Sequence, residues 1–307
     1  MSTAEFLAPS RCSPSSLCAY HEARVGISEI PPSDVYAQAQ LAEIAQIVSQ
    51  RKDNPDYSQL SLVDKLRTIL TLVNNYWEQN HQLLDGPLRE NYVQWATDAE
   101  KRGKFPTHGW MASPQQASQM IETLKTLREE GVILDRWLLL GTASGANTAQ
   151  LVDTFYRADV EPRLFILDRC VPPIKDSLAD GRIGLESDVL HLPLYNASIQ
   201  AASAHFITNF IPSEKQRISE CMNRMQTRLL KEQFFREIYR VLQKGGLFVG
   251  IVGTPISFLD TAEIIKTLTQ GGFLTKKIIL VSTTDLTDYD INTNHHEPGD
   301  LFLLAFK

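Results

Sequence analysis

Hydrophobic and polar residues follow two different periods along the chain, and the change falls near Gly131. Before Gly131, apolar residues recur at helical spacing, which places them on one face of each helix. Ser33 and Ser61 precede two of these stretches and are of the residue types that favour the N-cap. We expect N-terminal helices over 33–50, 62–77, 83–101 and 115–130.

After Gly131, short apolar runs alternate with helical stretches, which is typical of a mostly parallel sheet covered by helices on both faces. The predicted strands are 136–141, 163–168, 183–188, 203–208, 246–252, 276–283 and 301–306. The predicted helices between them are 147–157, 172–178, 215–242 and 260–270. Because no helix is predicted between the last two strands, we expect them to form an antiparallel pair at one edge. The pattern therefore predicts an α/β fold with a seven-stranded, mostly parallel sheet whose last strand is antiparallel.

The same pattern predicts three parts in the chain. Residues 1–30 are expected to be a flexible arm, 31–112 a helical segment that covers a substrate, and 113–307 the sheet domain. Glycine and proline interrupt the helical pattern at 103–113, which marks a linker or lid.

Composition and charge exclude several classes of protein. Hydrophobic residues make up 43% of the chain and charged residues 21%, an ordinary globular balance. The net charge of -6 and the scattered basic residues argue against a nucleic-acid partner. No apolar run reaches the roughly 20 residues of a membrane span, so we expect no membrane partner. The four cysteines show no metal-binding or disulfide spacing, so we expect reduced thiols and a cytoplasmic location.

Two segments of the predicted sheet suggest a nucleotide site. The first strand runs into a turn of small residues, from Gly141 to Gly145, that leads into a helix. Glycine lets the backbone approach a ligand closely, and free amides at a helix start favour negative groups. Asp168 ends the second strand about 25 residues later, near the spacing of a ribose-binding carboxylate. Each segment also has an ordinary structural interpretation, as a strand-to-helix turn and as a solvated cap.

These segments resemble the class I family of S-adenosylmethionine-dependent methyltransferases over residues 113–307. Gly141 and Gly145 match the outer glycines of the family's first motif, and Asp168 matches the second motif. The segment 186–194 is similar to the third motif, and 235–249 is similar to the helix-turn-strand signature before the fifth strand. The resemblance implies a Rossmann-like fold and S-adenosylmethionine as cofactor. It implies cofactor contacts for Gly141, Thr142, Ala143, Gly145, Asp168, Arg169, Asp188, Val189 and Asn209, with Asp188 facing the adenine amine and Val189 beside the ring.

The sequence also departs from the family pattern. Leu139 stands where the family usually has an acid, Ala143 stands where it has its central glycine, and the predicted fourth strand has no carboxylate. These departures leave two alternatives open: a cofactor-free binding protein of the same fold, or a protein that uses the cofactor for a reaction other than methylation. NAD is a further competing ligand, because an acid after the second strand also contacts ribose in NAD-binding folds. The Leu-Pro and Lys-Gly-Gly segments argue against NAD.

Methyl transfer chiefly needs the nucleophile aligned with the methyl carbon, so a dedicated base is optional. For an acceptor hydroxyl, His205 and His108 are the candidate bases, because histidine titrates near neutral pH. Trp110 and Phe210 are the candidate contacts to a small-molecule acceptor with an oxygen or carbon nucleophile. The alternatives are a buried core histidine at 205 and a packed linker at 108–110. A homodimer stays an open alternative for the oligomeric state.

Two further groups of residues receive structural interpretations. His295, His296 and Glu297 follow several aspartates in a polar loop, which seldom supplies metal geometry, so we assign no metal. The aromatic residues of the N-terminal helices fit a core more often than the roof of a pocket. These aromatic residues are Tyr76, Trp77, Tyr92 and Trp95.

Overall fold

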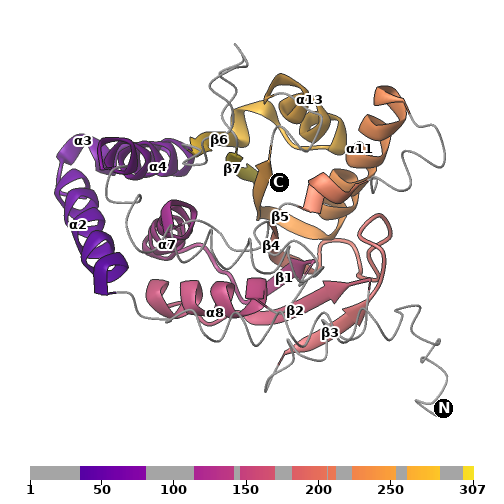
Figure 1. Ribbon diagram of the computed structural model, residues 1–307, viewed down its shortest axis with the longest axis horizontal. Helices are drawn as coiled ribbons and strands as arrows, with labels where there is room; N and C mark the ends of the chain where they lie inside the picture. Colours follow the sequence, from indigo (N-terminus) through magenta and orange to yellow (C-terminus); the bar gives the residue numbers. More distant parts are fainter. Residues whose placement is uncertain are drawn as a thin grey trace, which may run out of the picture.

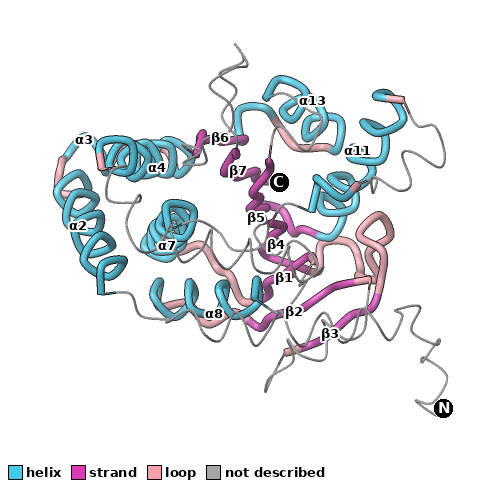
Figure 2. Tube along the Cα trace, viewed as in Figure 1, coloured by secondary structure: helices cyan, strands magenta, loops and turns pink. Residues whose placement is uncertain are grey.

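The computed structural model of the chain describes residues 35–80, 114–141, 146–169, 182–205, 207–211, 223–253, 261–283 and 300–307. These residues form one sheet with helices packed on both of its faces (Figure 1). The elements of the sheet run in succession from one edge of the molecule to the other, and the helices lie on either side (Figure 2).

The sheet has seven strands in the order β3-β2-β1-β4-β5-β7-β6. The strands are β1 (Arg136–Leu140), β2 (Arg163–Asp168), β3 (Ile183–Glu186), β4 (Ile199–His205), β5 (Leu242–Gly253), β6 (Ile278–Thr283) and β7 (Asp300–Phe306). β1 to β5 pair in parallel, whereas β7 runs antiparallel between β5 and β6. This topology confirms the predicted Rossmann-like, mostly parallel sheet with an antiparallel last strand.

Two groups of helices cover the faces of the sheet. One face packs against α4 (Leu62–Gln79), α7 (Pro114–Glu129) and α8 (Ala146–Ala158). The other face packs against α11 (Arg224–Val241) and α13 (Thr261–Gly271). The described residues also form the helices α2 (Val35–Lys52) and α3 (Pro55–Ser58) and the short 3-10 helices η1 (Ile207–Phe210) and η2 (Thr275–Lys277).

The apolar run of β1 follows from its burial on both faces. Leu138 and Leu140 belong to the hydrophobic cluster beneath α11 and α13, whereas Trp137 and Leu139 belong to the cluster beneath α4, α7 and α8. Successive residues of a strand point to opposite faces, so a strand covered on both sides is apolar throughout. The indole Nε1 of Trp137 donates a hydrogen bond to Ser203 Oγ of β4 over 2.8 Å, which satisfies its only polar atom.

The predicted bounds of β4 and β5 differ from the structure. β4 was expected over 203–208, but it begins at Ile199 and ends at His205, where η1 follows after one residue. Its first half is built from Gln200, Ala201 and Ala202, which lack the branched and aromatic side chains that indicate strands. β5 begins at Leu242 rather than at residue 246, and an irregular register between Ile199 and Ala201 accommodates this early start.

The N-terminal helices are joined to the sheet through α4. Leu66 and Leu70 of α4 are fully buried in the cluster that includes β1 residues. Ion pairs between Lys52 and Glu129 (2.5 Å) and between Lys65 and Glu130 (2.6 Å) fasten α2 and α4 to the end of α7. α4 therefore belongs to one helical layer of the sheet.

Tyr76 and Trp77 lie in a separate apolar cluster between α2 and α4. Their core interpretation agrees with this position, whereas Tyr92 and Trp95 lie outside the described residues. The division into an arm at 1–30, a covering segment at 31–112 and a sheet domain stays a prediction, because residues 81–113 also lie outside the described part.

We expect Leu70→Ala to lower the free energy of unfolding by roughly 2–5 kcal/mol, because it empties a fully buried site between α4 and the sheet. The matched control is Leu274→Ala, at a side chain that is 51% exposed, which should change stability by less than about 0.5 kcal/mol. Urea unfolding followed by circular dichroism measures both. Equal stability of the two variants would contradict the placement of α4 in the core.

Candidate functional site

The carboxyl ends of β1, β2 and β4 meet at one edge of the sheet. In the parallel register, Leu140 of β1 pairs with Leu167 of β2 and with Ala204 of β4. Each of these three paired residues is followed by a candidate residue: Gly141, Asp168 and His205. The three candidates therefore lie in one row at the carboxyl edge of the sheet. The chain leaves β1 toward β2 and β3 on one side and returns to β4 and β5 on the other. Ligands of open α/β sheets bind outside the carboxyl ends of strands at such a switch point.

Gly141 ends β1 in a conformation that favours glycine. Its φ is +74°, in the left-handed region, and its amide donates to the Leu167 carbonyl of β2 over 2.8 Å. A Cβ atom at this position would lie 2.9 Å from Ile207 Cδ1. The left-handed backbone conformation thus favours the glycine, and a Cβ would in addition displace the end of the Ile207 side chain. Thr142, Ala143 and Gly145 lie outside the described residues, and α8 begins just beyond them at Ala146.

Asp168 closes β2 one strand away from Gly141. It pairs in register with Glu186 of β3, and its carbonyl accepts a hydrogen bond from the Ser187 amide over 3.0 Å. Arg169 follows at the surface, with Nη2 3.5 Å from Asp188 Oδ2. The ends of β2 and β3 thus bring the two predicted carboxylates to the same part of the edge, with Arg169 beside Asp188.

The turn after β3 fixes the side chain of Asp188. Its Oδ1 accepts a hydrogen bond from the Leu190 amide over 2.9 Å, and its carbonyl accepts one from the His191 amide over 3.0 Å. An aspartate that bonds the backbone two residues ahead in this way forms an Asx turn. Val189, within the turn, is buried in the cluster beneath α11. One oxygen of Asp188 therefore orders the turn, while the other faces Arg169.

His205 ends β4 as a buried, neutral imidazole. Its side chain is 8% exposed, and its Nδ1 has no hydrogen-bond partner among the described residues. Burial lowers the pKa of His205 from 6.5 to about 4, because the charged form is poorly solvated there. Such a group is a weak base at neutral pH, so it is better suited to positioning a ligand by hydrogen bonding than to accepting a proton.

Other buried polar atoms lie on the elements around His205. Alternation along β4 places His205 on the face of Ser203, which α7 and α8 cover. Gln119 of α7, Thr148 of α8 and Thr208 of η1 each have a buried side-chain polar atom without a partner in the described part of the chain. Buried polar groups are normally hydrogen-bonded, so each of these atoms is a candidate for a contact with water or with a bound ligand. The sequence analysis missed Gln119 and the two threonines, since neither residue type stands out in a helix or loop.

The structure brings most of the predicted cofactor residues to one edge. These are Gly141, Asp168, Arg169, Asp188 and Val189, with His205 beside them. The backbone of η1 carries Asn209 and Phe210, whose side chains are outside the described part. His108 and Trp110 also lie outside it.

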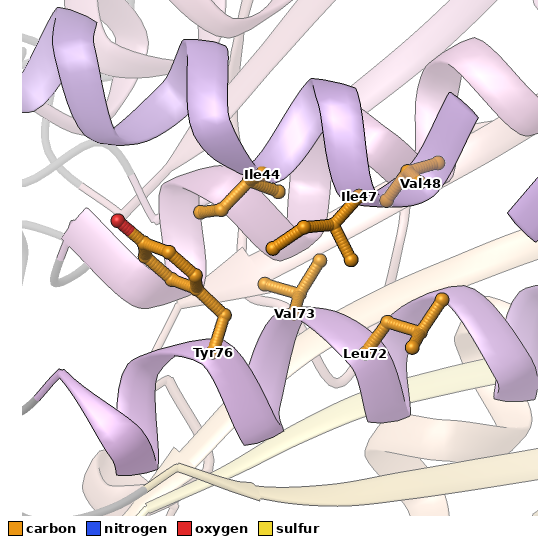
Figure 3. Close-up of a pocket in the computed structure, with 6 residues that line it drawn as sticks. All are labelled: Ile44, Ile47, Val48, Leu72, Val73 and Tyr76. Atoms are coloured by element: carbon orange, nitrogen blue, oxygen red, sulfur yellow. The ribbon is translucent and has the colours of Figure 1, made fainter. Parts of the chain in front are cut away.

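A narrow apolar crevice lies elsewhere, between α2 and α4 (Figure 3). Its lining residues are Ile44, Ile47, Val48, Leu72, Val73 and Tyr76. The Tyr76 hydroxyl donates to Glu43 Oε2 over 2.7 Å, so its polar atom is already occupied. None of the lining residues belongs to the carboxyl edge of the sheet, and the crevice is not part of the candidate site.

The described residues bring no group of three histidine, cysteine, aspartate or glutamate side chains together that could hold a metal ion. Among the helices of the described part, none is long and apolar enough to cross a membrane.

Comparison with known proteins relates the chain to others through its fold. No protein-family model and no curated protein matches the sequence. The chain is similar to an S-adenosylmethionine-dependent methyltransferase from Thermotoga maritima, with 14% identity, a TM-score of 0.38 and coverage of 61% of this chain and 89% of that one. It is similar to another from Aquifex aeolicus, with 13% identity, a TM-score of 0.41 and coverage of 59% and 87%.

A third similar structure is geranyl diphosphate C-methyltransferase from Streptomyces coelicolor, in complex with Mg²⁺, geranyl diphosphate and S-adenosylhomocysteine. It has 13% identity and a TM-score of 0.38, with coverage of 64% of this chain and 84% of that one. Likeness at this level describes the fold alone. The strand order and the antiparallel β7 are those of the class I methyltransferase fold.

We expect Gly141→Ala to destabilise the fold more than Gly131→Ala. Both glycines have positive φ, which costs an alanine about 1–2 kcal/mol, but a Cβ at Gly131 meets nothing within 4 Å, whereas one at Gly141 meets Ile207. Adding Ile207→Val to Gly141→Ala removes the Cδ1 atom and should recover part of the difference. Chemical unfolding measures all three variants, and equal losses at the two glycines would show that η1 does not press on Gly141.

We expect His205 to make stability fall as the pH drops from about 6.5 to about 4. Its folded-state pKa lies below the unfolded value, so in this window the unfolded chain binds the extra proton and gains population. The stabilising effect is fully present above pH 6.5 and is lost below 4, a change of roughly 3 kcal/mol at about 1.4 kcal/mol per pKa unit. His205→Gln should remove this dependence in urea unfolding at several pH values. An imidazole NMR signal of His205 that titrates near 6.5 would contradict its buried, neutral state.

Proposed function

We propose that the chain binds S-adenosylmethionine at the carboxyl edge of its sheet and transfers the methyl group to an oxygen or carbon atom of a small molecule. The observation that supports this most is that Gly141 and Asp168 directly follow the paired residues Leu140 and Leu167 of adjacent strands. A left-handed glycine turn and a strand-end carboxylate stand side by side, one strand apart, at the switch point of the sheet. A backbone that can approach a nucleoside closely thus stands next to an acceptor for ribose hydroxyls.

Each part of the edge takes one part of the cofactor. Asp168 would accept hydrogen bonds from the ribose hydroxyls, and Gly141 would approach the nucleoside through its backbone, with Thr142, Ala143 and Gly145 as further predicted contacts. The turn after β3 lies on the adenine side, where Asp188 faces the ring amine and Val189 packs beside the ring. Arg169 orients Asp188 through their contact, and Asn209 follows β4 at the methionine end.

When bound, the cofactor supplies an electrophilic methyl group, and the protein aligns the acceptor with it. His205 stands at the β4 end of the row and is neutral at physiological pH, so it would hold an acceptor hydroxyl or carbonyl by hydrogen bonding. Thr208 adds a buried hydroxyl on the adjoining η1. The proton of a hydroxyl acceptor then leaves to water or to His108, whose role as a base stays a prediction. Trp110 and Phe210 are the proposed apolar contacts to the acceptor.

A binding protein without cofactor is the second candidate, and the burial of Leu139 favours it. Leu139 is fully buried in the apolar cluster with α4, α7 and α8. Because this position carries leucine, the acid that the methyltransferase family usually has here is absent. The methionine ammonium group of the cofactor would therefore lack a charged partner at this position. Such a charged hydrogen bond is worth about 1.5–3 kcal/mol. In this alternative the same carboxyl edge binds a macromolecular or small ligand without chemistry.

We expect calorimetric titration of the full chain with S-adenosylmethionine and S-adenosylhomocysteine to show binding, and Asp168→Asn to weaken it by about 10-fold to 100-fold. The carboxamide keeps the size of the side chain but loses the charged acceptor, a difference of roughly 1.5–3 kcal/mol.

The matched control is Asp153→Asn, an exposed residue of α8 that pairs with Arg157 and should leave affinity unchanged. No heat with either ligand at millimolar concentration would favour the cofactor-free binding protein, and heat with NAD instead would replace the proposed cofactor.

A further inference from the structure

Side chains of α11 hold the segment that follows β3, and two of them, Arg240 and Glu237, make most of the contacts. The guanidinium of Arg240 donates to the carbonyl of Leu192 through Nη2 over 2.8 Å and to the carbonyl of Leu194 through Nη1 over 2.7 Å. Nη1 also donates to Asn196 Oδ1 over 3.0 Å. One planar side chain therefore fixes three points along a segment that is more than 40 residues away in sequence.

Glu237 completes this clamp from one turn earlier on α11. Its Oε2 accepts the Leu192 amide over 2.8 Å, so both the amide and the carbonyl of Leu192 are bound. The two side chains also bind each other in a bidentate pair, Nε to Oε1 over 2.9 Å and Nη2 to Oε2 over 2.8 Å. The hydrogen bond from Arg240 is the main reason that the pKa of Glu237 lies below its ordinary value. The carboxylate is thus held in its ionised form.

A third contact reaches the Asp188 turn itself. Gln233, one turn further toward the start of α11, donates from Nε2 to the Leu190 carbonyl over 3.2 Å. The amide of the same Leu190 donates to Asp188 Oδ1 over 2.9 Å. The turn that carries Asp188 and Val189 is therefore tied to α11 on its far side, immediately after the two residues proposed to contact adenine.

The clamp acts mostly on main-chain groups. Side chains of α11 bind four backbone groups of the loop. These are the Leu190 carbonyl, the Leu192 amide, the Leu192 carbonyl and the Leu194 carbonyl. Such contacts set the path of the loop whatever its side chains are. A loop that is held in its binding conformation loses less conformational entropy when a ligand binds.

We propose that Glu237 and Arg240 are positioning residues for the adenine side of the cofactor site, acting through the loop of Asp188 and Val189. The inference rests on the proposed function, because it requires a nucleoside at this loop. Part of the affinity for the cofactor would then depend on α11, a helix that contributes no predicted cofactor contact. Because the clamp lies on the β3 side of the edge, it acts on nucleoside binding and not on the acceptor side at His205.

The test uses the full chain with Arg240→Lys, which keeps the charge but cannot make the forked contacts to two carbonyls. We expect S-adenosylhomocysteine and adenosine to bind this variant about tenfold more weakly in calorimetric titration. Glu237→Gln keeps the shape of the pair and one acceptor for the Leu192 amide, so it should lose less. The matched control is Arg157→Gln, at an arginine of similar exposure on α8 whose ion pair with Asp153 does not touch the loop.

Hydrogen exchange separates positioning from general stability. In Arg240→Lys, the amides of Leu190 to Leu192 should exchange faster, while those of β1 and β4 keep their protection. Two results would overturn the inference and leave the proposed function standing. One is faster exchange throughout the sheet in Arg240→Lys; the other is that the wild-type chain binds both ligands and Arg240→Lys binds them with the same affinity. If the wild-type chain binds neither ligand, both proposals fall. Should Arg240→Lys not fold, Gln233→Ala, which removes the contacts to the Leu190 carbonyl and the His191 ring, provides the same comparison with a smaller expected loss.

Discussion

The register of β1 between β2 and β4 is the constraint on which the candidate site depends. β1 pairs in parallel with both neighbours and is buried on both faces. A slip by one residue would exchange Leu138 and Leu140 with Trp137 and Leu139 between two differently shaped clusters. It would also break the hydrogen bond from Trp137 to Ser203. Core packing thus fixes the register, and the register alone brings Gly141, Asp168 and His205 into one row.

The same row separates charged from uncharged groups. Asp168, Glu186 and Asp188 lie at the ends of β2 and β3, with Arg169 beside them. At the ends of β1 and β4, the described side chains are His205, which burial keeps neutral, and Ile207 and Thr208 of η1. The edge therefore offers carboxylates to hydroxyl and amine groups on one side and a weakly polar surface on the other. A nucleoside on the first side and an uncharged acceptor on the second would match this distribution.

Much of the fold could be predicted from the sequence because the strands beside the switch point carry strong patterns. Trp137–Leu140 and Leu164–Leu167 are apolar throughout, and their neighbours in sequence supply the glycine and the acid. β4 was harder to locate, since it is built largely from alanine and serine, which pack tightly at the centre of a sheet but carry little strand propensity. The predicted strand, 203–208, instead includes the bulkier Phe206 and Ile207.

Contacts between distant segments were beyond the reach of sequence patterns. Glu237 and Arg240 stand three residues apart on a helix, the spacing of an ordinary surface ion pair. Nothing in that spacing shows that both side chains reach back to Leu192, because the groups they bind are main-chain atoms that every residue has. The burial that makes His205 neutral cannot be inferred from the sequence either, because it depends on the helices α7 and α8 that cover this face of β4.

Leu139 shows how core packing bears on recognition. It lies in the cluster that also receives Leu66 and Leu70 of α4, the helix that ties the N-terminal segment to the sheet. A carboxylate among these apolar side chains would need a buried partner, and an unpaired one would cost several kcal/mol. An apolar residue at 139 therefore follows from the way this face is packed. Under the proposed function, recognition of the methionine end would then depend on uncharged groups, and His205 and Thr208 are candidates because their buried polar atoms lack partners within the described chain.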